Sequence, residues 1–154
     1  MLHLSTCEHI RRDYWNHFLR PIKDMGFPDP ENTTNLLTVG AINDEKTANE
    51  EVIGILTIAW RCLYAEITAS RLNNKRLKLV SARKRAWCMI HGRLNAYGEA
   101  CRTFCIERRF SGRKCKLPKK LSKRKIIQVQ QNGTYTINTV ITETTRLLRG
   151  KSRS

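Results

Sequence analysis

Positive charge is concentrated in one part of this chain, and that distribution limits which parts can fold compactly. Residues 71–125 contain 19 Lys or Arg against two acids, whereas residues 1–70 contain six basic residues against ten acidic ones. The net charge of +16 opposes compaction because like charges repel one another. Only 40% of the 154 residues are hydrophobic, which is low for a compact domain. We therefore expect one ordered part of domain size with exposed basic stretches.

The beginning of the chain and its six cysteines bear on the compartment. Residues 1–12 lack a continuous apolar segment, so no secretory signal peptide is predicted and a reducing compartment is expected. Cysteines in such a compartment are thiols or metal ligands rather than disulfides. The longest apolar stretch, 52–64, is interrupted by Arg61 and is shorter than the roughly 20 residues of a membrane span. No transmembrane helix is predicted.

The N-terminal segment 7–20 shows helical periodicity. Its apolar side chains fall on one side at steps of three and four residues: Ile10, Tyr14, Trp15, Phe18 and Leu19. Pro21 is expected to disturb the last turn, because proline has no N–H group to donate. Residues 21–46 are polar and rich in turn residues, which indicates a linker.

A longer helix is predicted over 47–72. Thr47 and Glu50 have the spacing of a capping box, and Asn73-Asn74 is the expected break. The apolar residues of this segment surround more than one face. We therefore expect most of the helix to be buried, and we expect a homodimer formed through residues 50–68.

The basic block shows weaker patterns. Residues 75–87 suit an exposed arm or a helix extension, 88–115 are punctuated by glycine and are expected to be irregular, and 116–125 form a basic linker. A β-hairpin follows this linker. Residues 143–154 are expected to fade into a basic tail.

The register of the hairpin follows from the side chains around Asn132-Gly133. A two-residue turn would pair apolar with polar side chains. A three-residue loop, 131–133, with a left-handed glycine as its last residue, is preferred because it pairs like with like. The pairs predicted by this loop are Val129 with Tyr135 and Ile127 with Ile137.

Four potential zinc ligands lie within the basic block. Nine residues separate two close pairs, Cys88 with His91 and Cys101 with Cys105. Thiolate and imidazole are the usual ligands of structural zinc, which takes four in a tetrahedron. Cys115, nine residues further on, is an alternative fourth ligand. Zinc is the predicted cofactor, and the competing interpretation is a set of isolated thiols, with the first pair on one helical face.

The run Arg83-Lys84-Arg85, followed by Trp87, is typical of nucleic-acid binding. Basic side chains contact phosphates, and an exposed indole stacks on an unpaired base. A solvated charged turn is the alternative, which is less favoured because the block is nearly free of acids. A membrane surface would need more apolar anchors than the block offers, so no membrane partner is predicted. Further phosphate contacts are expected from Arg93, Arg102, Arg108, Arg109, Lys119 and Lys120.

Catalytic arrangements are scarce in this sequence. The basic block contains only Glu99 and Glu107 as acids, and no Gly-rich phosphate loop or nucleophile motif is present. His91 has no evident carboxylate partner. We expect a binding protein rather than an enzyme, with RNA or DNA as partner and no small-molecule substrate.

The same basic segment resembles a viral protein family. The residues that carry the likeness are SARKRAWC at 81–88, HGRL at 91–94 and CRT at 101–103. They resemble the small cysteine-rich nucleic-acid-binding proteins encoded near the 3′ end of plant flexivirus genomes, of the carlavirus and vitivirus type. Those proteins place an apolar helix before an Arg-rich run and a zinc knuckle directly after it. The resemblance covers about residues 50–115 and departs from the family at His91, where a second Cys is usual.

The resemblance implies a zinc-dependent protein of a plant RNA virus that binds nucleic acid with little sequence preference and suppresses host RNA silencing. The expected location is the host cytoplasm, and the runs 83–85 and 119–125 also match nuclear import signals. A structural RNA-associated protein, ribosomal or ribonucleoprotein, without a metal site is the alternative. The expected fold is α+β and mainly α, with an N-terminal helical part (1–72), a basic zinc-knuckle segment (73–125) and a C-terminal β-hairpin with a tail (126–154).

Overall fold

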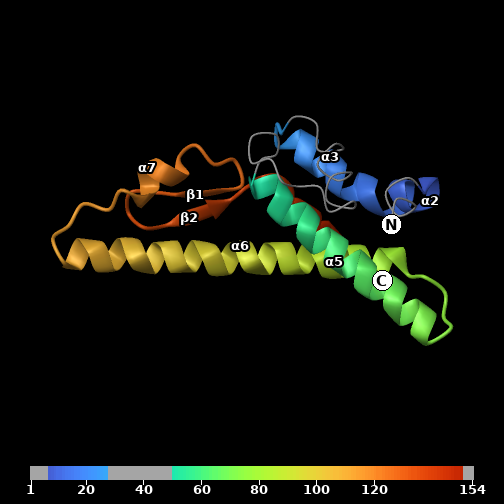
Figure 1. Cartoon of the computed structure of the whole chain (residues 1–154). Coiled ribbons are helices and arrows are strands. Elements are labelled where there is room, and N and C mark those ends of the chain that lie inside the picture. The colour runs from blue at the N-terminus through green and yellow to red at the C-terminus, as the bar shows by residue number, and fades with distance from the viewer. Residues whose placement is uncertain (1–6, 28–49, 151–154) are drawn as a thin grey trace.

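The computed structural model describes residues 7–27 and 50–150, and this part of the chain is mainly helical (Figure 1). A two-stranded antiparallel sheet lies near its C-terminal end. The predicted class, mainly helical with a C-terminal hairpin, is confirmed. The elements in chain order are α2 (Glu8–Ile10), the π-helical segment η1 (Arg11–Trp15), α3 (Asn16–Asp24), α5 (Glu50–Leu72), α6 (Leu79–Phe110), α7 (Leu117–Leu121), β1 (Ile127–Val129), β2 (Tyr135–Ile137) and α8 (Thr139–Gly150).

The N-terminal helical run is longer than predicted. It passes through Pro21 and ends with Gly26 in the left-handed conformation, at φ 87°. The Gly26 N–H donates to the Lys23 carbonyl at 2.8 Å, and the Phe27 N–H donates to the Ile22 carbonyl at 3.3 Å. These two bonds form a Schellman motif, in which the buried Phe27 and Ile22 side chains are the usual apolar pair.

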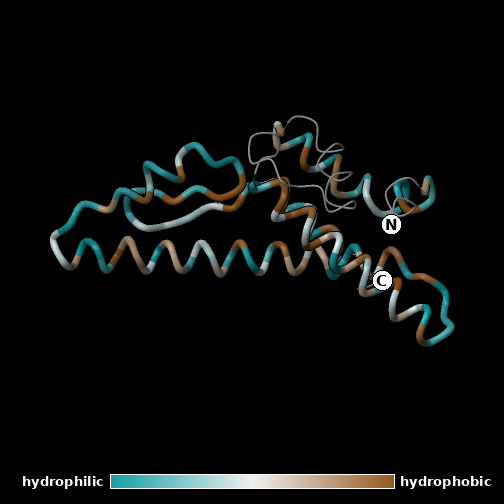
Figure 2. The backbone as a smooth tube through the Cα atoms, viewed as in Figure 1, coloured by the Kyte–Doolittle hydropathy of each residue, from teal (hydrophilic) through white to brown (hydrophobic). Residues whose placement is uncertain are grey.

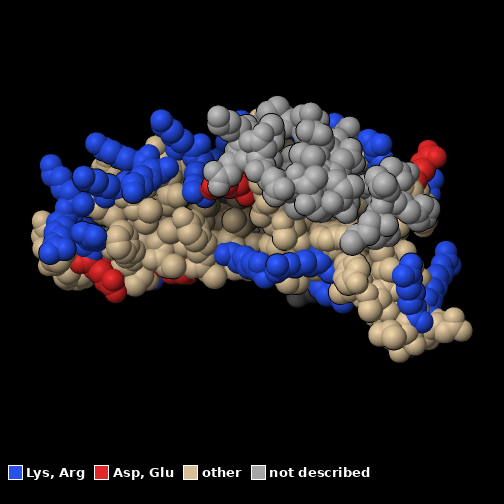
Figure 3. Space-filling view, in the orientation of Figure 1, with Lys and Arg blue, Asp and Glu red and all other residues tan. Residues whose placement is uncertain are grey.

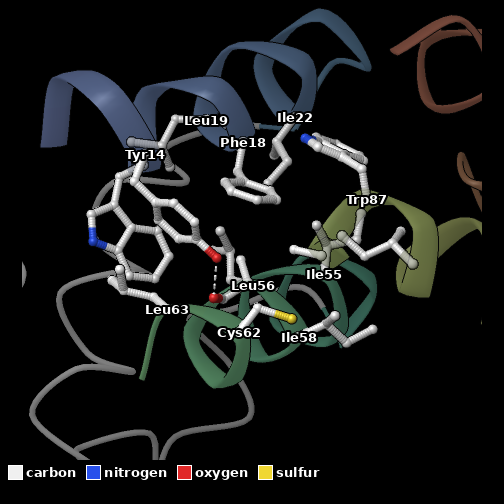
Figure 4. Close-up of a cluster of buried hydrophobic side chains, with 14 of the residues drawn as sticks. Tyr14, Phe18, Leu19, Ile22, Ile55, Leu56, Ile58, Cys62, Leu63 and Trp87 are labelled. Carbon is white, nitrogen blue, oxygen red and sulfur yellow. Dashed lines mark hydrogen bonds between the residues drawn. The ribbon is translucent and has the colours of Figure 1, made fainter. Parts of the chain in front are cut away.

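Helix α5 is the central core helix, as its apolar pattern predicts. The Tyr14 hydroxyl donates to the Ala59 carbonyl, which ties the N-terminal run to α5 (Figure 4). The predicted break after α5 is confirmed, since Asn74 has a φ of 49°; the Thr47 of the capping box lies outside the described residues. Seven residues of α5 are buried in this chain: Val52, Ile55, Leu56, Ile58, Ala59, Cys62 and Leu63.

Two further expectations about α5 are that it does not span a membrane and that it forms a homodimer. The helix is long and apolar enough, by length and composition, to cross a membrane, although the sequence analysis predicted no such helix. A core helix passes the same test, and the seven buried residues fit that role. The surface that motivated the homodimer is partly covered by α3 and α6 of the same chain, and the dimer stays a prediction.

Helix α6 contradicts the prediction of an exposed arm followed by an irregular segment. It runs unbroken for 32 residues, or about 48 Å at 1.5 Å per residue. One face carries mostly small buried residues at steps of three, four and eight: Leu79, Ala82, Ala86, Ile90, Gly98, Cys101 and Cys105. This stripe lets α5, α8 and the hairpin pack on one side of a single long helix.

The hydrophobic core forms two clusters along α6. The larger cluster joins the N-terminal run, α5, the first half of α6, Ile126 and Ile141. It therefore draws on all three predicted segments. The smaller cluster joins Cys101 and Cys105 of α6 to Leu121 and Val129. Together they give an elongated molecule in which α7 and the hairpin lie over the C-terminal half of α6 (Figure 1).

The hairpin has the predicted register. Ile127 pairs with Ile137 and Val129 with Tyr135, and Gly133 has a φ of 85°. The hairpin packs on α6 at Gly98, where a Cβ atom would lie only 2.7 Å from Cγ of Tyr135. The absence of a side chain at position 98 is what allows this close approach.

Two C-terminal expectations are wrong. The predicted basic linker contains α7, which begins with Leu117-Pro118; proline suits the first turn because its missing N–H has no helical partner there. The predicted tail is instead helix α8 as far as Gly150. The Asn138 side chain caps α8 by accepting the Val140 N–H at 3.0 Å, and Ile141 anchors the helix in the core.

Candidate nucleic-acid interface

The four predicted zinc ligands all lie on helix α6. Cys88 and Cys105 are 17 positions apart, which is about 25 Å along the helix axis. Zinc ligands must each lie within about 2.3 Å of one ion. Among residues 7–27 and 50–150, no group of three or more His, Cys, Asp or Glu is arranged to hold a metal. The predicted knuckle conformation is therefore wrong, and the residues present do not fit a zinc ion.

The cysteines separate into two surroundings instead. Cys88 is exposed, and His91 contacts the Asn95 amide at 3.3 Å. Cys105 is 1% exposed in the smaller core cluster, and burial raises its pKa to about 11. Its Sγ lies 3.2 Å from Sγ of Cys115. Cys115, the alternative zinc ligand, therefore lies next to Cys105, one of the four predicted ligands.

The run Arg83-Lys84-Arg85 lies beside the N-terminal helices rather than in open solvent. The Arg83 guanidinium donates to the Asp13 carbonyl at 2.8 Å, and burial lowers its pKa. The Arg85 guanidinium forms an ion pair with Glu66 at 3.2 Å. Two of the three predicted phosphate contacts already have protein partners, so this run is partly structural.

Trp87 contradicts the prediction of an exposed stacking residue. Its side chain is 1% exposed and lies parallel to Phe18, with ring centroids 5.1 Å apart and planes 12° apart (Figure 4). An indole in this position cannot reach a base without leaving the core. The tryptophan therefore joins α6 to the N-terminal run.

The remaining predicted cations divide between the middle and the end of α6. Arg93 is exposed in the middle of the helix, and Arg102 pairs with Glu99 at 2.9 Å. Arg108 and Arg109 lie in the last turns, where the chain reverses and brings α7 alongside. Lys119 lines a hollow with Arg109 and Lys120 lines another with Arg108, so these lysines and arginines lie at the same end of the molecule. Lys and Arg side chains gather on the surface at this end (Figure 3).

We call residues 104–123 the basic tip: the last turns of α6, the loop 111–116 and the segment that begins with α7. It contains eight cations and one acid, Glu107. In the described part of the chain, no carboxylate lies within salt-bridge distance of any of the eight. The eight cations are Arg108, Arg109, Arg113, Lys114, Lys116, Lys119, Lys120 and Lys123.

The surface of the basic tip is hollowed in two places. One hollow of about 710 Å³ is lined by Arg109, Arg113, Lys114, Lys116 and Lys119, among others. A second of about 430 Å³ lies between Phe104, Arg108 and the lysines of the loop and α7. Figure 2 shows mainly hydrophilic residues over the loop and α7 at this end. Concave, cationic surfaces of this kind concentrate anions near them.

Exposed aromatic side chains accompany the charge. Phe110, the last residue of α6, is 90% exposed, and Phe104 is 43% exposed. The Arg108 guanidinium lies 5.2 Å from the centroid of the Phe104 ring, a cation–π contact. Aromatic faces beside cations can stack on bases while the cations contact phosphates. Neither phenylalanine was predicted as a site residue, although Phe110 lies within the acid-free run 108–125 and Phe104 lies four positions before it.

Comparisons with protein-family models, curated proteins and solved structures found no match.

A further concavity, apolar rather than basic, lies between α5, α6 and β1. It has a volume of about 280 Å³, with Ile55, Ile90 and Leu94 in its lining. Glu51 and Arg124 are also among the lining residues. Burial raises the pKa of Glu51, and the N–H groups of Lys125 and Ile126 donate to its carboxylate and oppose that rise. Glu51 thus holds the segment that leads from α7 into β1.

Proposed function

We propose that this chain binds nucleic acid through the basic tip, by contacts to phosphate with little sequence preference. The observation that carries the proposal is the group of eight cations at one end of the molecule, with no described carboxylate in salt-bridge distance. Cations without a carboxylate partner can exchange their counterions for phosphates, which is the main source of nonspecific affinity. Phe104 and Phe110 add faces on which unpaired bases can stack.

The proposal places the phosphate contacts further along the chain than the run 83–85. Arg83 and Arg85 donate to groups of the N-terminal run and α5, so using them for phosphate means exchanging existing contacts. Arg108, Arg109, Lys119 and Lys120 keep the role that the sequence predicted. Zinc has no part in this proposal, because the predicted ligands are spread along α6.

The viral reading extends the proposal. The apolar helix and the Arg-rich run of the flexivirus pattern both occur here as helices, α5 and the start of α6. We propose on that resemblance that the chain is a plant-virus protein that suppresses host RNA silencing. A transient assay in leaves that express a silenced reporter tests this extension. The extension is supported if the native protein restores the reporter signal and the tip variant defined below does not. It is refuted if the native protein restores no signal.

A structural RNA-associated protein is the second candidate. The continuous helix in place of a knuckle favours it, since that alternative assumed no metal site. Stoichiometric sedimentation with ribosomal particles would support this candidate over the viral one.

The binding test compares two variants that lose the same charge at opposite ends of the molecule. The tip variant replaces four lysines by Gln: Lys114, Lys116, Lys119 and Lys120. The control variant replaces four cations near the α5–α6 connection by Gln: Arg71, Lys75, Arg76 and Lys78. All eight residues are exposed, so neither set removes core packing.

Fluorescence anisotropy with random-sequence single-stranded RNA measures the outcome. Each phosphate contact contributes roughly 0.7 decades of affinity at 0.1 M salt, so four lost contacts should weaken binding by roughly three decades, on the order of several hundredfold. The control variant should bind within a few-fold of the native protein. Equal losses in both variants would show that net charge, rather than the tip, determines binding. Preferential binding of both proteins to anionic vesicles over RNA would also refute the proposal.

A further inference from the structure

The thiols of Cys105 and Cys115 form a close pair at the base of the loop 111–116. Cys105 is on α6, and Cys115 lies two positions before the first residue of α7. Their Sγ atoms are 3.2 Å apart. A disulfide bond needs about 2.05 Å, so a relative movement of roughly 1 Å would join them. This pair is not explained by metal binding, because the described residues hold no third ligand in position.

We propose that Cys105 and Cys115 are an oxidation site that forms a reversible disulfide by exchange with a small anionic disulfide such as oxidised glutathione. The inference is independent of the proposed nucleic-acid binding. It concerns the covalent state of the tip.

The surroundings of the two sulfurs assign them different roles. Cys115 is half-buried and lines the larger hollow, together with Arg109, Lys114 and Lys116. These cations attract the carboxylates of oxidised glutathione to the accessible thiol. Cys105 is nearly inaccessible to solvent, and burial raises the pKa of its thiol, so it is the poorer nucleophile toward a reagent in solution. Cys115 is therefore the first attacking group.

The exchange takes two balanced steps. The Cys115 thiolate attacks one sulfur of oxidised glutathione, forms a mixed disulfide and releases one glutathione thiolate. The Cys105 thiolate then attacks the Cys115 sulfur and releases the second glutathione. The two protons lost by the cysteines are taken up by the two glutathione thiolates. One disulfide is reduced and one is formed, so no other oxidant is needed.

The other cysteines near the tip are poorer partners. Cys101 lies one turn before Cys105 on the same helix, α6, and is buried in the smaller core cluster. Cys88 is exposed but lies 17 positions from Cys105 on the same helix. The second step is intramolecular and starts from neighbouring atoms, so the mixed disulfide at Cys115 should not accumulate.

The disulfide would close a loop that carries four cations of the tip: Arg108, Arg109, Arg113 and Lys114. Because the ring spans only residues 105–115, the oxidised form should fix this loop against α6. Its amide hydrogens should then exchange more slowly with solvent in the oxidised protein than in the reduced one.

Peptide mapping of the full chain tests the proposal. Reduced native protein is incubated with oxidised glutathione, quenched with acid and N-ethylmaleimide, and digested with trypsin. Trypsin cuts between the two cysteines, at Arg108, Arg109, Arg113 and Lys114, so a disulfide joins two peptides that otherwise separate. The expected product is peptide 103–108 linked to peptide 115–116, and dithiothreitol should separate them.

Two variants fix the order of the steps. Cys105→Ser should accumulate glutathione on Cys115, because the resolving thiol is gone. Cys88→Ser, the matched control, should give as much linked peptide as the native protein. Native protein in which both thiols are alkylated while Cys88 carries glutathione would overturn the proposal. A stable glutathione adduct on Cys115 of the native protein, or a Cys101–Cys105 link, would overturn it as well.

Discussion

The contact between Gly98 and Tyr135 gives the sharpest prediction about the fold. Gly98 is in the middle of α6, and a Cβ atom there would lie 2.7 Å from Cγ of the Tyr135 ring. The ring is held in place at its far end, since its hydroxyl donates to the Glu99 carboxylate at 3.2 Å and lies 3.5 Å from the Asn95 amide oxygen. Gly92, on the same helix, has nothing within 4 Å of its own Cβ position. The two glycines form a matched pair.

The two substitutions to Ala should change the free energy of unfolding in opposite directions. Replacing Gly by Ala inside an exposed helix stabilises it by about 0.8–1.0 kcal/mol. Gly92→Ala should therefore raise the free energy of unfolding by up to about 1 kcal/mol. Gly98→Ala gains the same propensity but forces the ring aside, and overpacking of this kind costs about 1–3 kcal/mol. The variant at position 98 should thus be less stable than the variant at position 92 by about 1–3 kcal/mol.

Urea denaturation followed by circular dichroism measures both variants. A double-mutant cycle isolates the contact: in a Tyr135→Ala background, Gly98→Ala should become stabilising, as at Gly92. Equal stabilisation at both positions in the native background would show that the hairpin does not pack on α6. Destabilisation by Gly92→Ala would show that α6 is not a continuous helix there.

Three further predictions concern the buried Trp87, the basic run 83–85 and the carboxyl group of Glu51. Trp87→Ala should lower the free energy of unfolding by about 3–5 kcal/mol in the same assay, because the indole is buried against Phe18; a loss below about 1 kcal/mol would contradict its burial. Replacing 83–85 together by Ala should lower the melting temperature but weaken RNA binding less than the tip variant does, and the reverse order would contradict the site assignment. Burial raises the pKa of Glu51, so stability contributed by its protonated form is lost as pH rises through the folded pKa. The free energy of unfolding of the native protein, relative to that of Glu51→Gln, should therefore increase as the pH falls through the folded pKa of Glu51 toward 4.5. A difference between the two proteins that does not change with pH would refute this.

Local signals explain which elements could be predicted. Large apolar side chains at helical spacing marked the N-terminal run and α5, and the alternation around Gly133 fixed the hairpin register. Each of these signals lies within one element or between neighbours in the sequence. The net positive charge of the tip was equally visible, because charge can be counted without knowing the fold.

The continuous helix α6 was not predicted because most of the residues at helical spacing on its buried face are small. Ala82, Ala86 and Cys101 face the core, and they give little hydropathy contrast with the basic residues between them. Gly98 is one of the glycines that led to the prediction of an irregular segment, but its role depends on Tyr135, 37 positions away. Close packing at a glycine in a helix is a tertiary property that its own segment does not reveal.

The prediction that Trp87 is an exposed stacking residue was wrong for a related reason. Trp87 follows a basic run, as a stacking residue would, but its partner Phe18 lies on a helix 69 positions earlier. The convergence of Arg108 and Lys119 at one end depends on the reversal of the chain after α6. The basic composition of the tip was thus predictable, whereas the grouping of its cations at one end needed the fold.

The salt dependence of RNA binding tests the central claim most directly. If the tip neutralises about six phosphates of a single strand, log affinity should fall against log salt with a slope near −4 to −5. The tip variant, which lacks four lysines, should have a slope shallower by roughly three units, and the control variant should keep the native slope. A tip variant with the native slope, or a control variant with the shallower one, would contradict phosphate binding by the basic tip.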